Sequence, residues 1–258
     1  MSTDAIGTRA WRERTGGTLS RRERLAHQAA ALALLTADLP SRVRFRRAAG
    51  AQGLDVDVVP PATDLVRAAT AWAEDVHESW LLRHGLRTWV FGHLLGQLDG
   101  VEPDPEALYL ACLMHDVGLT ADHRIPQGAS ADSCSCFAVH GAHVSEQKLL
   151  ELGASPSLAS EVADAIGLHL NAKVGVESGG AAHLVNQGAA LDVVGTRASD
   201  VGRALIAQVI VLYDRTGFAD ELLPVLRVEN AERPAARMAS LFGIGMGPAI
   251  RLNPLNRM

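Results

Sequence analysis

The chain of 258 residues is poor in aromatic side chains, in cysteine and in net charge. Phe, Trp and Tyr make up only 4 % of it, which argues against a stacking platform for single-stranded nucleic acid. A formal charge of −5 creates no strong field that would attract nucleic acid or an anionic membrane. The three cysteines, two of them separated by a single residue, form no disulfide framework. We therefore expect a cytoplasmic protein without nucleic-acid partners.

Long apolar runs are also absent. No stretch approaches the roughly 20 residues that are needed to cross a bilayer. Near the start of the chain, Arg9, Arg12 and Arg14 interrupt the apolar run that a secretory signal would need. The sequence thus predicts a soluble protein without a membrane partner.

Apolar residues are nevertheless plentiful, at 48 %, and from residue 63 onwards they recur with a helical period. The predicted helices cover residues 63–76, 78–98, 105–116, 140–152 and 155–170, a segment around Asp192, and residues 199–213 and 231–242. Asn230 is the predicted cap of the last helix, and the tail from Gly243 is predicted to be irregular. No segment alternates convincingly as a strand, so the predicted fold class is all-α.

The first 58 residues differ from the rest because they are rich in arginine. Ser20 and Glu23 form a capping-box pattern, which predicts a helix to about Leu35. Two interpretations stay open: an arm that binds a partner, or a helix packed on the body with a solvated basic face. The prolines in the linker at 55–62 separate this extension (1–58) from the main domain. We predict that the main domain spans 59–220 and that a C-terminal helix and tail (221–258) pack on it.

The adjacent pair His115–Asp116 is the sharpest local signal. An apolar helical stripe precedes it, so a helix delivers the imidazole from its core face. A charged Asp in such a place is costly unless it is paired or bound to a metal. Adjacent residues diverge by about 100° on a regular helix, but they can converge on one ion where the helix is ending, as Gly118 implies.

Two further residues fit the same chemistry. His84 shares an apolar face with Leu81 and Thr88, so it is expected to point inward. Asp192 lies among small and apolar residues, where an acid is either paired or a ligand. Two imidazoles and two carboxylates suit Zn²⁺, Fe²⁺ or Mn²⁺.

The ordered set His, His–Asp and Asp on successive helices resembles the HD-domain superfamily of metal-dependent hydrolases. Within it, the chain is most similar to the cyanamide hydratase family. The segments that carry this resemblance are residues 78–80 (ESW), 83–92 (RHGLRTWVFG), 108–120 (LYLACLMHDVGLT), 137–142 (FAVHGA) and 191–195 (LDVVG). The resemblance covers about residues 63–215 and implies an HD-domain helical bundle with the N-terminal helices as an extension.

The resemblance also implies one divalent metal, with zinc as the expected ion and iron or manganese as alternatives. The implied metal ligands are His84, His115, Asp116 and Asp192. HD enzymes with two metals carry two more histidines between the His–Asp pair and the last Asp, and this chain has His140, His143 and His169 in that interval. A second metal, held by His140 or His143 with His169 and bridged by Asp116, is therefore an alternative. Otherwise His169 is expected to face the substrate, because its helix points it inward.

The resemblance implies a hydratase or hydrolase in which metal-bound hydroxide attacks a small nitrile-like molecule, such as cyanamide, which would yield urea. Asp116 is the predicted proton acceptor and His169 a predicted donor to the developing charge. The residues predicted to contact the substrate are Trp89, Thr120, Phe137, His140 and His143.

Three hypotheses about the function remain open from the sequence. The first is the hydratase or hydrolase just described. The second is a phosphohydrolase acting on a nucleotide or phosphomonoester, or a di-iron oxygenase, which would use the additional histidines. The third is a non-catalytic helical scaffold. The Leu/Ala/Val-rich segment 204–212 is also a candidate for the symmetric interface of a homo-oligomer.

Overall fold

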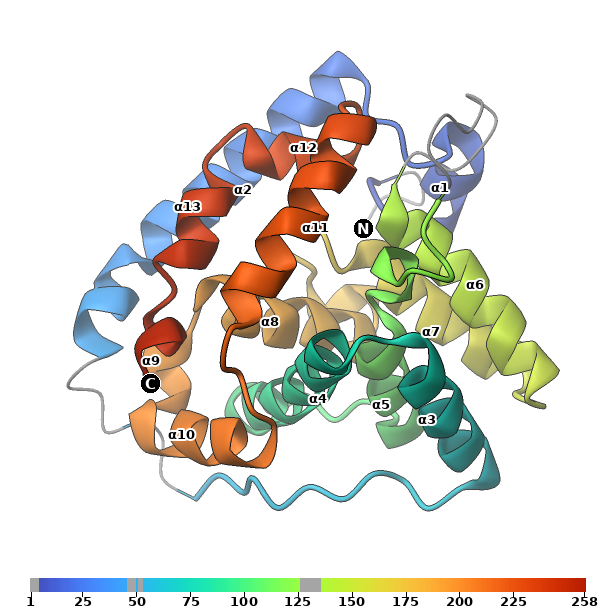
Figure 1. Ribbon diagram of the computed structural model, residues 1–258, viewed down its shortest axis with the longest axis horizontal. Coiled ribbons are helices and arrows are strands. Elements are labelled where there is room, and N and C mark those ends of the chain that lie inside the picture. Colours follow the sequence, from blue (N-terminus) through green and yellow to red (C-terminus); the bar gives the residue numbers. More distant parts are fainter. Residues whose placement is uncertain (1–4, 46–49, 51–52, 126–135) are drawn as a thin grey trace.

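The computed structural model describes residues 5–45, 50, 53–125 and 136–258, except for the side chains of residues 42 and 43. Within these residues all regular structure is helical, which confirms the all-α prediction (Figure 1). The helices are α1 (Arg9–Thr15), α2 (Arg21–Arg44), α3 (Asp64–Val76), α4 (Ser79–Asp99), α5 (Pro105–Met114), α6 (Phe137–Glu151), α7 (Pro156–Leu168), α8 (Gly180–Val194), α9 (Ala198–Val201), α10 (Arg203–Leu212), α11 (Phe218–Glu232), α12 (Arg237–Phe242) and α13 (Met246–Arg251). Short 3₁₀ turns lie at Val117–Leu119 (η2), Val176–Ser178 (η3) and Pro254–Arg257 (η4). None of these described helices combines the length and the hydropathy that crossing a membrane would require.

Local sequence signals set most helix starts. Ser20 and Glu23 form the predicted capping box at the start of α2. Thr63 caps α3 through its side chain, and Ser155 caps α7 in the same way. Asp104 accepts two backbone N–H groups of α5, and Pro105 takes the first helical position. These helices begin where the sequence predicts because the caps satisfy N–H groups that have no partner inside the helix.

Helices α4, α5 and α8 form the centre of the molecule, and glycines allow them to approach closely. An ideal Cβ on Gly188 of α8 would lie 2.3 Å from the main-chain oxygen of Thr88 in α4. A Cβ on Gly85 of α4 would lie 3.0 Å from the main-chain oxygen of Cys112 in α5. The backbones that carry the candidate ligands are therefore in direct contact.

Several predicted boundaries are wrong. Helix α2 continues past Leu35 to Arg44 and includes Pro40, and no glycine lies near Leu35 to stop the helix there. The predicted helix 199–213 is divided into α9 and α10 at Gly202, whose φ is +89°.

The C-terminal region is more ordered than predicted. Asn230 does not cap a helix but lies inside α11, whose buried residues Leu222, Leu223 and Leu226 recur at helical spacing. The tail from Gly243 is not irregular, because it forms α13 and η4. This tail returns to the centre of the molecule, where Asn253 donates to the main-chain oxygen of Asp192.

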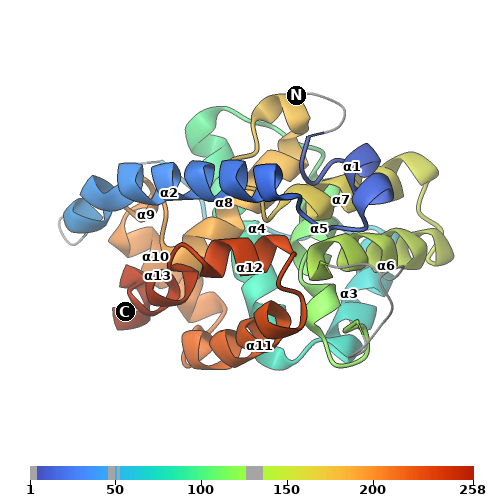
Figure 2. The same cartoon turned by 90° about the horizontal axis from the view of Figure 1, so that it is seen from above.

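The N-terminal extension packs on the body. Trp11 of α1 is fully buried, and its Nε1–H donates to Glu23 of α2 at 2.7 Å. Arg12 is buried as well, donates to the main-chain oxygen of Ala163 and pairs with Asp164 on α7. Helix α2 then runs along α12, as Figure 2 shows from above. Part of the arginine-rich face is thus directed at the protein rather than at solvent.

Candidate metal centre

Four buried side chains converge where the central helices meet. His84 lies in α4, whereas His115 and Asp116 follow the last turn of α5. His169 stands at the end of α7, in the position corresponding to that of His115 on α5. Asp116 has φ −106° and ψ 13°, so the helix ends there, and this turn lets two adjacent side chains face the same space.

The donor atoms of three of these residues form an almost equilateral triangle. His84 Nε2 and His115 Nε2 are 3.1 Å apart, and Asp116 Oδ2 lies 3.5 Å from the first and 3.4 Å from the second. Ligands at about 2.0–2.1 Å around a tetrahedral ion are roughly 3.3–3.4 Å apart. The triangle therefore has the dimensions of one face of a tetrahedral metal site.

The hydrogen bonds on the far side of each ring determine its tautomer. Nδ1 of His84 lies 2.7 Å from Asp192 Oδ2, and Nδ1 of His115 lies 2.7 Å from the main-chain oxygen of Cys112. His169 Nδ1 is likewise 2.7 Å from the main-chain oxygen of Ile166. A carboxylate or carbonyl oxygen only accepts, so each Nδ1 carries a proton, and Nε2 is the ring nitrogen that each histidine turns toward the cluster.

Burial disfavours the charged form of two of these rings, those of His115 and His169. It lowers the pKa of His115 and lowers that of His169 to about 3. Burial alone would raise the pKa of Asp116, but His115 and the other nearby histidines lower it below its usual value. The Nε2 atoms of the histidines and the Asp116 carboxylate thus face one another in a buried space, and a divalent cation is what this donor set fits.

Asp116 uses its two oxygens differently. Oδ2 belongs to the triangle with His84 and His115, whereas Oδ1 lies 3.5 Å from His169 Nε2. His169 is therefore part of the same cluster. Its ring is edge-on to that of His115, with centroids 5.1 Å apart.

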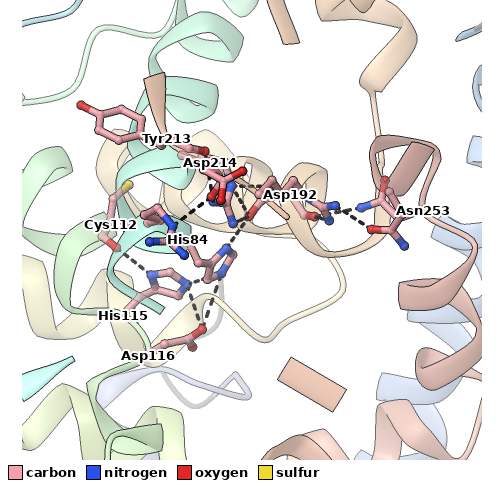
Figure 3. Close-up of polar contacts among 12 residues, drawn as sticks. His84, Cys112, His115, Asp116, Asp192, Tyr213, Asp214 and Asn253 are labelled. Carbon is pink, nitrogen blue, oxygen red and sulfur yellow. Dashed lines mark hydrogen bonds and ion pairs between the residues drawn. The ribbon is translucent and has the colours of Figure 1, made fainter. Parts of the chain in front are cut away.

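Asp192 occupies a different place from the other three predicted ligands. Its Oδ2 accepts from Nδ1 of His84, so its carboxylate lies behind that ring rather than beside Asp116 (Figure 3). Burial alone would raise the pKa of Asp192, but the guanidinium groups of Arg87 and Arg215 hold it well below its usual range. The structure gathers His84, His115 and Asp116 and leaves Asp192 outside this group. Its role as a ligand stays a prediction.

A cavity of about 110 Å³ opens onto the cluster. Its polar walls are His84, His115, Asp116, His169, Asn171 and Asn186, and its apolar walls are Ala31, Leu34, Leu35, Leu119, Phe137, Leu170, Ala172, Ala189, Ala190, Val193, Val194, Leu222, Leu226, Met238, Leu241 and Met246. Among the described residues, no lysine or arginine lines it.

Of the residues predicted to contact substrate, only Phe137 lines this cavity. Trp89 packs against Tyr109 in the core instead, with ring centroids 5.0 Å apart. The Thr120 hydroxyl donates to the main-chain oxygen of Val117, so the local turn already uses it.

The remaining two predicted contacts are also elsewhere. His140 and His143 both lie on α6, where His140 is half-buried and His143 is exposed. Neither lines the cavity, so the geometry supports neither the predicted substrate contacts nor a second metal held by them with His169.

Sequence reasoning missed the residues around Asp192. Arg87 follows His84 by three residues in α4 and is fully buried. The occurrence of an arginine within an apolar helix face was the signal in the sequence that indicated a buried partner. Arg215 and Asn253 carry no such signal. They reach Asp192 only through the tertiary fold.

The sequence profile of the HD domain matches residues 81–211, about half of the chain, and this segment contains the whole cluster. The chain belongs to the HD-domain family. HD domains are generally metal-dependent hydrolases, which agrees with the donor set of His84, His115 and Asp116. A comparison with curated proteins gives no match. The HD segment ends before Arg215 and Asn253, so the surroundings of Asp192 are completed by residues outside it.

Proposed function

We propose that this HD-domain protein is a metal-dependent hydratase or hydrolase that adds water to a small, uncharged, nitrile-like substrate. Cyanamide, which would give urea, is the smallest such substrate. The observation that supports the proposal is the convergence of the histidine lone pairs and the Asp116 carboxylate on a small apolar cavity.

The cavity favours a small molecule without charge. Its volume of about 110 Å³ is below that of the roughly 150 Å³ apolar cavity that holds benzene in another protein. Recognition of a phosphate group normally relies on Arg, Lys or helix N-termini. The described lining offers no cationic side chain, which argues against a nucleotide or phosphomonoester.

His84, His115 and Asp116 would hold the ion. A bound divalent metal would act as a Lewis acid and make water a nucleophile near neutral pH. Asp116 is ionised and can accept a proton through Oδ1, and His169 lies 3.5 Å away to share it. As the water oxygen bonds to the nitrile carbon, this proton would pass to the nitrile nitrogen, and the resulting isourea would tautomerise to urea.

One observation favours a second candidate. The two oxygens of Asp116 face different histidines, which is the arrangement of a bridging carboxylate. A second metal beside His169 would give a dinuclear HD site, as in a phosphohydrolase or a di-iron oxygenase. The number of ions per chain separates the two candidates.

The test combines metal analysis with substrate assays. The purified protein is measured for zinc, iron and manganese per chain, and then for urea formed from cyanamide, amide formed from small nitriles, and phosphate released from phosphomonoesters. We expect one ion per chain, activity on a nitrile-like substrate, and loss of both in His115→Ala. His93→Ala, on α4 but away from the cavity, is the control that should retain both.

Two ions per chain with phosphate release would favour the second candidate. No ion after reconstitution, together with no turnover, would refute a metal-dependent enzyme and leave the non-catalytic scaffold.

A further inference from the structure

Part of the cavity wall is built by helices that lie outside the HD segment 81–211. Helix α2 precedes this segment, and α11, α12 and α13 follow it. The lining residues that these helices contribute are apolar and include Leu34, Leu35, Leu222, Leu226, Met238 and Met246. We call these six residues the apolar wall. The HD segment supplies the metal-binding group, whereas the apolar wall comes from residues that the family profile does not cover.

Helix α2 is fixed beside the cavity by polar contacts as well as by packing against α12 (Figure 2). His27 lies one turn before Ala31, which also lines the cavity. Its Nδ1 is 3.2 Å from the Ser240 hydroxyl of α12, and its Nε2 is 3.1 Å from the main-chain oxygen of Leu170. Gln28 donates to the main-chain oxygen of Ser240 at 3.2 Å. Moving α2 would leave buried polar groups without partners, so its part of the apolar wall is held in place.

The two polar side chains of the cavity outside the histidine and aspartate cluster are engaged by the protein itself. Asn186 donates from Nδ2 to the main-chain oxygens of His169 and Asn171, at 2.9 and 2.8 Å. Asn171 donates to the main-chain oxygen of Ile6, and its Oδ1 accepts from Arg237. Almost all of the accessible surface of the cavity is apolar. A polar substituent of a substrate would therefore lose hydrogen bonds with water there and gain few in return.

The size of the cavity limits the length of the substituent. A cavity of roughly 150 Å³ holds the six carbons of benzene in another protein. On that scale, the volume of about 110 Å³ gives room for about four or five non-hydrogen atoms. Propionitrile and butyronitrile have this size, and their substituents are hydrocarbon. Cyanamide is smaller, and its substituent is a polar amino group.

We propose that the apolar wall selects the substituent of the substrate, and that the preferred substrate is a nitrile with a short aliphatic chain rather than cyanamide. The inference rests on the proposed function for the reaction. Water adds across the carbon–nitrogen triple bond: its oxygen bonds to the carbon, both of its protons end on the nitrogen, and the product is a primary amide. Each methylene that leaves water for the apolar wall should strengthen binding about fourfold.

The experiment follows binding and turnover along a series of cyanamide, acetonitrile, propionitrile, butyronitrile and benzonitrile. NMR titration of the metal-free full chain gives the affinities, and the zinc-loaded chain is assayed for amide or urea. We expect affinity and kcat/KM to rise about fourfold per carbon from acetonitrile to butyronitrile. Cyanamide should rank below propionitrile, and benzonitrile should bind more weakly than butyronitrile because it exceeds the volume of the cavity.

Matched variants test the apolar wall directly. Leu35→Gln keeps the size of a half-buried side chain but gives the wall a hydrogen-bonding group. It should reduce the ratio of kcat/KM for butyronitrile to that for cyanamide at least about tenfold. Met246→Gln, at a half-buried position of α13, should shift the ratio in the same direction. Leu32→Gln is the control, because Leu32 is exposed on the same helix and does not line the cavity. Zinc affinity should be unchanged in all three variants.

The outcomes separate the apolar wall from the proposed reaction. Cyanamide as the preferred member of the series, with the same preference in Leu35→Gln and Met246→Gln, would overturn the inference and leave the proposed function standing. If no member of the series is turned over, the proposed function fails, whereas the affinities of the metal-free chain still test the wall. An affinity that does not rise from acetonitrile to butyronitrile would then overturn the inference, and a rise that Leu35→Gln abolishes would support it.

Discussion

The contact between α4 and α8 should be intolerant of a single methyl group at Gly188. An ideal Cβ there lies 2.3 Å from the main-chain oxygen of Thr88 and 2.9 Å from the main-chain nitrogen of Gly92. Both neighbours are backbone atoms, so the two helices would have to separate by about 1 Å, and overpacking of this kind costs about 1–3 kcal/mol. The helix propensity of alanine offsets about 0.5–1 kcal/mol. We expect Gly188→Ala to lower the free energy of unfolding by about 1–2 kcal/mol.

The same separation should weaken metal binding, because His84 and Asp192 lie on the two helices that move apart. Urea unfolding gives the stability, and chelator competition should show at least about a tenfold loss of zinc affinity. The matched control is Gly247→Ala on α13, where a Cβ has only ordinary contacts at 3.7 Å or more. That variant should be neutral or slightly more stable. Equal behaviour of the two variants would refute the reasoning that close backbone contact fixes the site.

Three other predictions follow from buried groups and from the candidate ligands. Burial lowers the pKa of His77 to about 4, and its Nε2 has no hydrogen-bond partner among the residues that the structure describes. The unfolded chain therefore binds more protons between about pH 6.5 and 4, and stability falls as the pH drops through that window. Between pH 6.5 and 5, the free energy of unfolding of His77→Phe should therefore fall by about 2 kcal/mol less than that of the wild type, as measured by urea unfolding of the metal-free proteins. Equal losses in the two proteins would show that His77 is not responsible. Zinc at 100 times its Kd should raise the free energy of unfolding by about 2.7 kcal/mol. A chelator or the substitution Asp116→Asn should abolish this gain, and an equal gain in the variant would exclude Asp116 as a ligand. Trp11→Ala should lower the free energy of unfolding by about 3–5 kcal/mol, because the indole is fully buried. Leu25→Ala, on the exposed face of α2, should change it by less than about 0.5 kcal/mol. A small effect at Trp11 would mean that the N-terminal helices are dispensable to the fold.

Spacing and local chemistry in the sequence were enough to predict the helical fold and to select His84, His115 and Asp116, which the fold brings together. A helical period reports which face of a helix is buried, so His84 could be predicted to point inward, and it is 1 % exposed. The pair His115–Asp116 could be placed at a helix end because Gly118 follows it. Caps such as Ser20 and Thr63 act within one turn, and for that reason they were predictable.

Other features depended on segments that are distant in the sequence. His140 and His143 were reasonable candidates by order along the chain, but α6 carries them away from the cavity. The cavity itself is enclosed by side chains from α2, α8, α11 and α12. These helices are far apart in the sequence, so no regular spacing of residues along the chain could indicate that they line one cavity. Whether a polar residue faces a site depends on which neighbouring helix covers it.

Asp192 shows this division most clearly. Its apolar surroundings in the sequence indicated that the carboxylate would be paired or bound to a metal, but they could not say which. Arg215, 23 residues further on, and Asn253, 61 residues further on, decide its surroundings in the fold. A one-dimensional pattern records the burial of a charge because burial follows from local periodicity, whereas the partner that neutralises it is chosen by the packing of distant segments.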